Sequence, residues 1–246
     1  MTFLEITTLA LVFATLAIIY SSVGHGGGSG YLAAMALAGF VAADVMKPTA
    51  LCLNILVSGI ALARFARVGG FRWRLIWPFI VTSIPCAFMG GMTDLDPTLY
   101  KRLLGVLLLL AAIRLAMPAP AARAQRGIPL GAALVAGAVI GFLSDLIGIG
   151  GGIFLSPIIL LAGWGDAKQT AATSAAFILV NSVSGLLGHV TLVTNVPSAI
   201  GVWLVVVGAG GFIGAGFGCR RFDATLFRRA LAVVLVVAGV KMLVVS

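Results

Sequence analysis

The chain has 246 residues, of which 61% are hydrophobic and only 9% are charged. A soluble domain needs roughly 25% charged residues to cover its surface, so this composition excludes a soluble protein and predicts a surface that faces lipid. The net charge of +9 does not indicate nucleic-acid binding, because most of the 16 Lys and Arg residues lie between apolar stretches, where they orient a chain in the bilayer.

Ten apolar segments follow one another along the chain. Their continuous apolar runs predict helices rather than the alternating strands of a membrane barrel. The second and seventh are too short to cross a hydrocarbon core of about 30 Å, which takes about 20 helical residues. Glu5 stands where a signal peptide would be basic, so the first segment is predicted to be a retained membrane helix. The expected segments are 3–23, 29–41, 48–66, 74–92, 99–117, 129–147, 152–164, 171–190, 197–218 and 226–245.

The two halves of the sequence resemble each other. Residues 24–28 read GHGGG and residues 148–152 read GIGGG, and a second match joins 96–104 to 223–231. This duplication predicts an all-α polytopic membrane protein made of two repeats of about five helical segments, with short broken helices at the glycine runs. We expect the first repeat at 1–117, a linker rich in Pro, Ala and Arg at 118–128, and the second repeat at 129–246.

The basic loops predict how the repeats are oriented. If all ten segments change sides, the loops at 64–74, 114–126 and 220–229 share one face, which is then cytoplasmic. Five segments per repeat give the two repeats inverted topologies, with both termini outside. Lys101 and Arg102 run against this arrangement, because they would be external. We expect a multi-pass protein of the cell membrane, in a bacterial inner membrane.

The paired glycine runs are the strongest candidates for a binding site. Consecutive glycines interrupt a helix and leave N–H groups free at the start of the next helix, where the helix dipole attracts anions. Two such breaks at matched positions predict an anion site near the midplane, although glycine is also common where membrane helices pack closely. The predicted substrate-binding residues in the runs are His25, Gly26, Gly27, Gly28, Ser29, Gly150, Gly151 and Gly152.

Polar side chains inside the apolar segments extend this candidate site. Amides and hydroxyls at such positions either contact substrate oxygens or bridge helices, and the sequence leaves both open. Ser58 and Ser182 have the same two interpretations. The further predicted substrate-binding residues are Thr49, Asn54, Thr173, Ser174 and Asn181.

Three ionisable residues are candidates for coupling or for attracting substrate. His25 lies within the first glycine run and titrates near neutral pH, so it could couple a proton to anion movement or serve a structural role. Asp145, three residues before Gly148, is either a proton or cation site or the outer end of a helix. Lys47 could draw anions inward or pair with Asp44 at the membrane surface.

Four short motifs together resemble the sulfite exporter TauE/SafE family of membrane permeases. They are the G-x-G-G-G run in both halves, Pro157 after the second run, the Thr-Ser and Asn-Ser pairs at 173–174 and 181–182, and the R-x-G-G-F-R-W-R loop at 67–74. The likeness covers essentially the whole chain. It implies a permease, often an exporter, for sulfite, sulfonates or other small organosulfur or carboxylate anions. Ala33 and His25 depart from the second-half pattern, which bears on the substrate and not on the transport class.

Two other functions fit parts of the sequence. A passive anion channel would use the same residues as a carrier. A rhomboid-type protease would use Ser29 in a G-x-S-G motif with His189 as base, but such a protease has no need of a second glycine run. No Walker motif, metal-ligand spacing or disulfide framework is present. We therefore predict a secondary transporter and not an enzyme, without a cofactor, whose partners are a small anion, the bilayer and a coupling ion, either proton or sodium.

Overall fold

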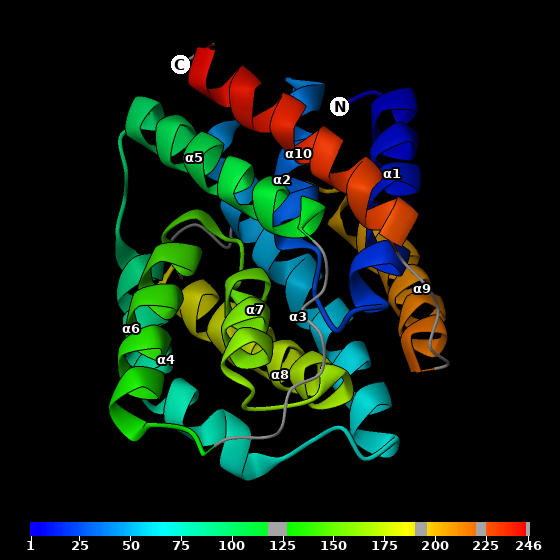
Figure 1. The fold of residues 1–246 in the computed structure, drawn as a ribbon. Coiled ribbons are helices and arrows are strands. Elements are labelled where there is room, and N and C mark those ends of the chain that lie inside the picture. Colours follow the sequence, from blue (N-terminus) through cyan, green and yellow to red (C-terminus); the bar gives the residue numbers. More distant parts are fainter. Residues whose placement is uncertain (118–126, 190–195, 220–224, 245–246) are drawn as a thin grey trace.

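The computed structural model describes residues 1–117, 127–189, 196–219 and 225–244, and this part of the chain forms ten helices and no strand (Figure 1). The all-α prediction is confirmed. Residues 118–126 of the predicted linker, 190–195 of the uncharged loop and 220–224 of the basic loop lie outside the described residues. The helices are α1 Phe3–Ser21, α2 Gly28–Ala38, α3 Ala43–Arg67, α4 Trp73–Met92, α5 Pro97–Ala116, α6 Leu130–Ile147, α7 Gly152–Ala162, α8 Ala167–Gly188, α9 Ile200–Cys219 and α10 Thr225–Val244.

Six of the described helices are long and apolar enough to cross a membrane, namely α1, α3, α4, α6, α8 and α9. By contrast, α2 and α7 have 11 residues each, as the two short apolar segments predicted. A helix of that length rises only about 16 Å, roughly half of the hydrocarbon thickness. The protein is therefore a multi-pass membrane protein with two half-length helices.

The sequence placed the starts of two helices several residues too late. α3 begins at Ala43 and α8 at Ala167, against the predicted positions 48 and 171. A capping box starts α8: the Asp166 carboxylate accepts from the Gln169 N–H at 2.9 Å, and the Gln169 side chain accepts from the Asp166 N–H at 3.2 Å. The first turn of α3 contains Asp44, with Lys47 following it, and that of α8 contains Lys168 and Gln169, so a search for apolar runs stopped short of both.

The most extensive helix contacts join the two halves of the sequence. α4 packs against α6 and α8, while α9 packs against α1 and α3. α3 also contacts α8, and α5 lies beside α10 across the top of the molecule in Figure 1. The stretches predicted as repeats are thus interlocked rather than side by side. Their superposition about an axis in the membrane plane stays a prediction.

Glycines allow the helices of different halves to approach closely. A Cβ atom added to Gly137 of α6 would overlap the carbonyl oxygen of Phe79 in α4. One added to Gly214 of α9 would overlap the carbonyl oxygen of Ile18 in α1. Close backbone contact of this kind stabilises helix pairs in lipid, where no hydrophobic effect drives helices together.

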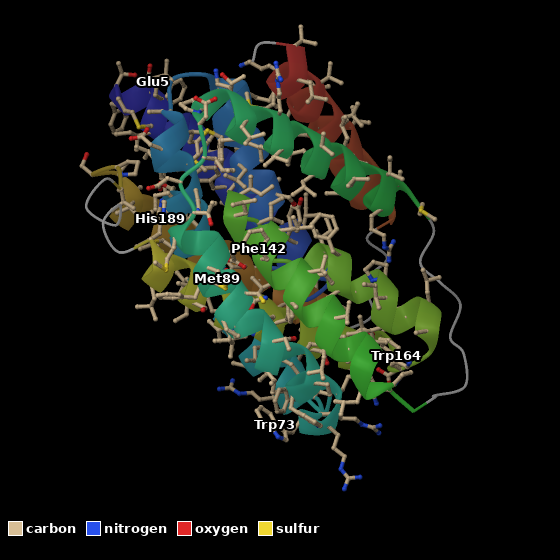
Figure 2. The ribbon with its side chains drawn as sticks, turned by 90° about the vertical axis from the view of Figure 1, so that its left-hand side faces the viewer. Glu5, Trp73, Met89, Phe142, Trp164 and His189 are labelled. Atoms are coloured by element: carbon tan, nitrogen blue, oxygen red, sulfur yellow. The ribbon has the colours of Figure 1, made fainter. Side chains whose placement is uncertain are left out.

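The long helices define two ends of the molecule. Glu5 and Trp73 lie at opposite ends, with His189 nearer to Glu5 (Figure 2). At the Trp73 end, the loop after α3 packs on the start of α8, where a Cβ atom on Gly70 would lie 2.8 Å from the Lys168 carbonyl oxygen. At the Glu5 end lie the start of α3 and the ends of α4 and α8. Consequently α3 and α8 run antiparallel through the middle of the protein.

Candidate functional site

The two glycine runs form the turns between α1 and α2 and between α6 and α7. Gly27 precedes α2 and Gly151 precedes α7, and both have left-handed backbone, with φ of 104° and 77°. This conformation favours glycine. Neither residue offers a side-chain hydrogen bond to the first amides of its helix. The N-termini of α2 and α7 therefore keep the partial positive charge of uncapped helix starts.

The two runs meet in the interior of the protein. A Cβ atom on Gly28 would lie 2.7 Å from the carbonyl oxygen of Ile149 and 2.5 Å from Nδ2 of Asn54. Asn54, from α3, bridges the runs, because its Nδ2 donates to the Ile149 carbonyl oxygen at 3.1 Å. Gly26 and Gly150 adjoin the same amide group. In this conformation the centre is closed by backbone contact and by one asparagine.

A chain of hydrogen bonds joins the first run to the second half. Nε2 of His25 lies 2.8 Å from the hydroxyl of Ser156 in α7, which lies 2.7 Å from the hydroxyl of Ser174 in α8. The Ser156 hydroxyl also donates to the carbonyl oxygen of Gly152 at 2.9 Å. Because a hydroxyl has one proton, Ser156 then accepts from both His25 and Ser174. The sequence analysis missed Ser156, whose only signal is its position one helical turn after Gly152.

Several buried polar atoms near the runs have no hydrogen-bond partner among the described residues. Asn54 Oδ1 and Ser182 Oγ are two of them, and Ser182 lies beside Gly150, where an added Cβ atom would be 3.0 Å from its hydroxyl. An unpaired buried polar group costs about 1–3 kcal/mol, so a ligand or ordered water is expected to complete such bonds. Other predicted site residues also have unpaired atoms among the described residues, namely Thr49 Oγ1, Asp145 Oδ1, Thr173 Oγ1 and Asn181 Nδ2.

Two predicted site residues are engaged elsewhere. The Oδ1 atom of Asn181 accepts from the hydroxyl of Ser83 in α4 at 2.8 Å, so this side chain faces α4. The hydroxyl of Ser29 lies 2.7 Å from the hydroxyl of Tyr20. His189 donates from Nδ1 to the carbonyl oxygen of Gly91 at 2.9 Å. Ser29 and His189, which the protease alternative would pair, are therefore bound to other partners.

A cavity of about 110 Å³ lies at the Glu5 end, next to the second glycine run. Lys47 lies at its wall, and the Cα atom and carbonyl oxygen of this lysine contact Gly148 of the run. The Lys47 ammonium is buried and donates to two carbonyl oxygens of α4, not to Asp44. Asp145 is fully buried rather than placed at an exposed helix end. The residues that line the cavity are Asp44, Lys47, Thr93, Asp94, Leu95, Pro97, Tyr100, Leu146 and His189.

Comparison with known proteins identifies the family of the chain. The family model described as sulfite exporter TauE/SafE matches residues 9–242. The chain belongs to the sulfite exporter TauE/SafE family. The family resemblance that the sequence motifs indicated is therefore confirmed, and the protein is a membrane transporter.

Curated relatives of this TauE/SafE family member carry transporter names. The probable membrane transporter protein y4hK of Sinorhizobium fredii is 43% identical over 244 residues, which cover 97% of this chain and 98% of that protein. The probable membrane transporter protein MJ0441 of Methanocaldococcus jannaschii is 28% identical over 151 residues, or 60% of this chain and 56% of its own length. Among the described residues, no group of three His, Cys, Asp or Glu side chains is placed to hold a metal ion.

Proposed function

We propose that this TauE/SafE family transporter exports small organic or sulfur-containing anions, such as sulfite or sulfonates, by alternating access around the two glycine runs. The observation that carries the proposal is the meeting of two uncapped helix N-termini at Asn54, deep inside a membrane protein. Paired half-helices of this kind hold anions in secondary transporters, because their N-terminal dipoles face the substrate charge.

The side chains around the runs suit an oxyanion. The hydroxyls of Thr49, Thr173 and Ser182 are donors without a hydrogen-bond partner among the described residues. A sulfite or sulfonate group presents three oxygen acceptors and a full negative charge. The donors would bind the oxygen atoms, and the helix dipoles would compensate the charge. The bond between His25 and Ser156 holds His25 beside the start of α7. Asn54 would have to move, since it now fills the space between the runs.

The closed centre favours a carrier over the channel alternative. A channel needs a continuous path, whereas a carrier passes through conformations in which the site is shut on one or both sides. Here the backbone at Gly28 contacts that at Ile149, and the cavity of about 110 Å³ lies on the Glu5 side of this contact. Rocking of α1 and α2 against α6 and α7 would open the runs to either end in turn.

Removal of an unpaired hydroxyl tests the site with little risk to folding. Ser182→Ala deletes a hydroxyl that no described residue binds, so the free energy of unfolding should be unchanged or slightly increased. If that hydroxyl binds substrate, sulfite counterflow into proteoliposomes should fall about tenfold, which corresponds to about 1.4 kcal/mol of lost interaction. Thr173→Val should behave in the same way.

Ser184→Ala is the matched control on the same helix. The Ser184 hydroxyl donates to the Ile84 carbonyl oxygen at 2.7 Å, so this variant should lose about 1 kcal/mol of stability and keep its transport rate. Counterflow should be measured with sulfite, sulfate, methanesulfonate and acetate. Full transport by both Ser182→Ala and Thr173→Val would place the substrate elsewhere, and lack of flux with every anion would reject the proposed function.

A further inference from the structure

The Lys47 ammonium occupies a position that resembles a cation site. It donates to the carbonyl oxygens of Gly90 and Gly91 at 3.2 and 3.0 Å. Both glycines lie in the last turn of α4, where the helix dipole favours a positive charge. Only 5% of the Lys47 side chain is exposed, so the charge is held away from water by backbone oxygens.

Asp145 supplies the negative charge beside this ammonium. It is fully buried at the end of α6, and its Oδ1 atom has no hydrogen-bond partner among the described residues. A Cβ atom on Gly185 would lie 2.5 Å from Oδ1, which places the carboxylate against the part of α8 that also contacts Gly91. The carboxylate and the Lys47 ammonium act on each other electrostatically. The ammonium thus binds two helix carbonyls directly, and the carboxylate acts on it from beyond contact distance.

The same oxygen atoms would bind a sodium ion. Secondary transporters use unwound backbone carbonyls and helix C-terminal ends to hold their coupling cation. α4 is a full-length helix, and its last-turn carbonyls present oxygens of the same kind. We infer that Lys47 is a tethered substitute for sodium, and that Lys47 and Asp145 couple anion transport to a proton instead. This inference rests on the proposed transport function. It also names which of the two coupling ions left open by the sequence is used.

Four other titratable groups line the cavity beside Lys47, namely His189, Asp44, Asp94 and Tyr100. Burial lowers the pKa of His189 below its ordinary value of 6.5, and the nearby Lys47 ammonium lowers it further, so His189 is neutral at physiological pH. Asp44 and Asp94 lie at the exposed mouth of the cavity, and Tyr100, from α5, donates to the Ile147 carbonyl oxygen at 3.3 Å. Acidic residues at the mouth favour the entry of cations, including protons.

The position of Lys47 against the second glycine run gives the coupling step. Its backbone and Cγ atom contact Gly148, so the ammonium needs only a side-chain rotation to leave α4 and approach an anion at the runs. Asp145 would then keep a buried negative charge without its counter-charge, which favours uptake of one proton from the cavity. Proton and anion would bind cooperatively, as symport requires, and a monovalent anion would move without net charge. Export would then take place when the outward gradient of the anion exceeds the inward gradient of protons.

The first experiment tests whether the ammonium replaces sodium, and it needs no substrate. Purified wild-type protein, Lys47→Met and Lys241→Met are unfolded by heat in sodium chloride and in choline chloride at equal concentration. Removing the tethered charge should let sodium bind, so Lys47→Met should melt several degrees higher in sodium, whereas the wild type should melt equally in both. Sodium stabilisation of the wild type, or its absence in Lys47→Met, would overturn the inference.

Lys241→Met is the matched control. The Lys241 ammonium also donates to two successive carbonyl oxygens at a helix end, those of Ala36 and Leu37 in α2, both at 2.9 Å. Among the described residues no buried carboxylate adjoins it, so this variant should show no sodium effect. If Lys47→Met does not fold in choline but folds in sodium, the inference is supported. If it folds in neither, the flux measurement below decides.

The second experiment measures proton and anion fluxes together in proteoliposomes. The wild type should carry about one proton with each methanesulfonate ion, and replacing sodium by choline should not change the rate. Asp145→Asn should lower the ratio of protons to anions, while His25→Gln should keep it. Anion flux without protons in the wild type contradicts the coupling inference and leaves the proposed function intact, whereas absence of anion flux contradicts the proposed function itself.

Discussion

The two glycine runs begin with the same kind of backbone packing contact, but only one of these two junctions has charged side chains. After α6, Gly148 packs against the backbone of Lys47 in α3. After α1, Gly24 packs against the backbone of Ala171 in α8, the residue that corresponds to Lys47 in the sequence repeat. The backbone scaffold is therefore matched at the two junctions, and the side chains are not.

The residues three positions before these glycines differ in the same sense. At the Gly24 junction, Ser21 donates to the Gly211 carbonyl oxygen at 2.8 Å and its hydroxyl is satisfied. At the Gly148 junction, Asp145 has an unpaired oxygen atom beside the Lys47 ammonium. A neutral junction suffices to hold a helix break in place. Under the inferred coupling, the charged junction serves proton transfer as well as packing, and coupling takes place at the Glu5 end.

The largest effect is expected from removing one charge of the charged junction. In choline, Lys47→Met leaves Asp145 buried without a counter-charge, which should lower the free energy of unfolding by about 3–5 kcal/mol. The double variant Lys47→Met/Asp145→Leu should recover most of this loss. Chemical unfolding in detergent measures both, and equal destabilisation of the single and double variants would mean that the two charges are not paired.

A smaller effect is expected where the runs meet, because that contact is backbone packing. Gly28→Ala would place a Cβ atom 2.5 Å from Asn54 Nδ2 and 2.7 Å from the Ile149 carbonyl oxygen. Overpacking of this kind should destabilise the protein by about 1–3 kcal/mol and stop anion counterflow. Gly131→Ala in α6 is the control, since nothing lies within 4 Å of the added atom. Normal transport by Gly28→Ala would show that the runs need not touch.

The neutral junction should respond more weakly still. Ser21→Ala removes the donor to the Gly211 carbonyl oxygen, with an expected loss of about 1 kcal/mol of stability and no change in the ratio of protons to anions. Thr15→Val on the same helix removes an exposed hydroxyl that bonds only within α1, so it should be nearly silent. If Ser21→Ala changes the ratio of protons to anions, the neutral junction also takes part in coupling and the two junctions do not differ in function.

The smallest effect concerns pH. The pKa of His189 is lower in the folded protein than the ordinary value of 6.5, so the unfolded state binds more protons below that pH. The contribution of His189 to stability is then complete above pH 6.5 and falls as the pH decreases through this value. Melting curves at pH 5 to 8 should show a slightly weaker pH dependence for His189→Gln than for the wild type. If His189→Gln and the wild type show the same pH dependence of melting, burial does not lower the pKa of this imidazole.

The sequence predicted the architecture because apolar length and glycine repetition are written directly in it. The ten segments, the two half-length helices and the breaks at Gly27 and Gly151 follow from residue order alone. The sequence analysis did not predict the first turns of α3 and α8. In α8 the reason is that a capping box, and not an apolar run, starts the helix. The predicted location of a break is thus more reliable than the predicted start of a polar-ended helix.

The candidate site was only partly predictable. The polar residues Asn54, His25 and Ser174 were identified because polar groups inside apolar segments stand out. The partners of these residues could not be identified in the same way. Ser156, which binds His25, has no distinctive sequence context. Nothing in the sequence indicates that Lys47 contacts Gly90 and Gly91. Tertiary contacts, within a half as well as between halves, determine which polar atoms are satisfied and which remain open, and local sequence pattern does not.

The interlocked packing of the two halves has a consequence for how the protein is made. During translation α1 enters the membrane long before α9, and α4 before α6, yet these are the pairs that pack most closely. The surface of α1 that packs against the glycines of α9 therefore stays exposed to lipid until α9 has been inserted. A ribosome that stalls between α5 and α6 would release a half whose helices have met few of their final neighbours, and such a fragment is a natural target for membrane quality control.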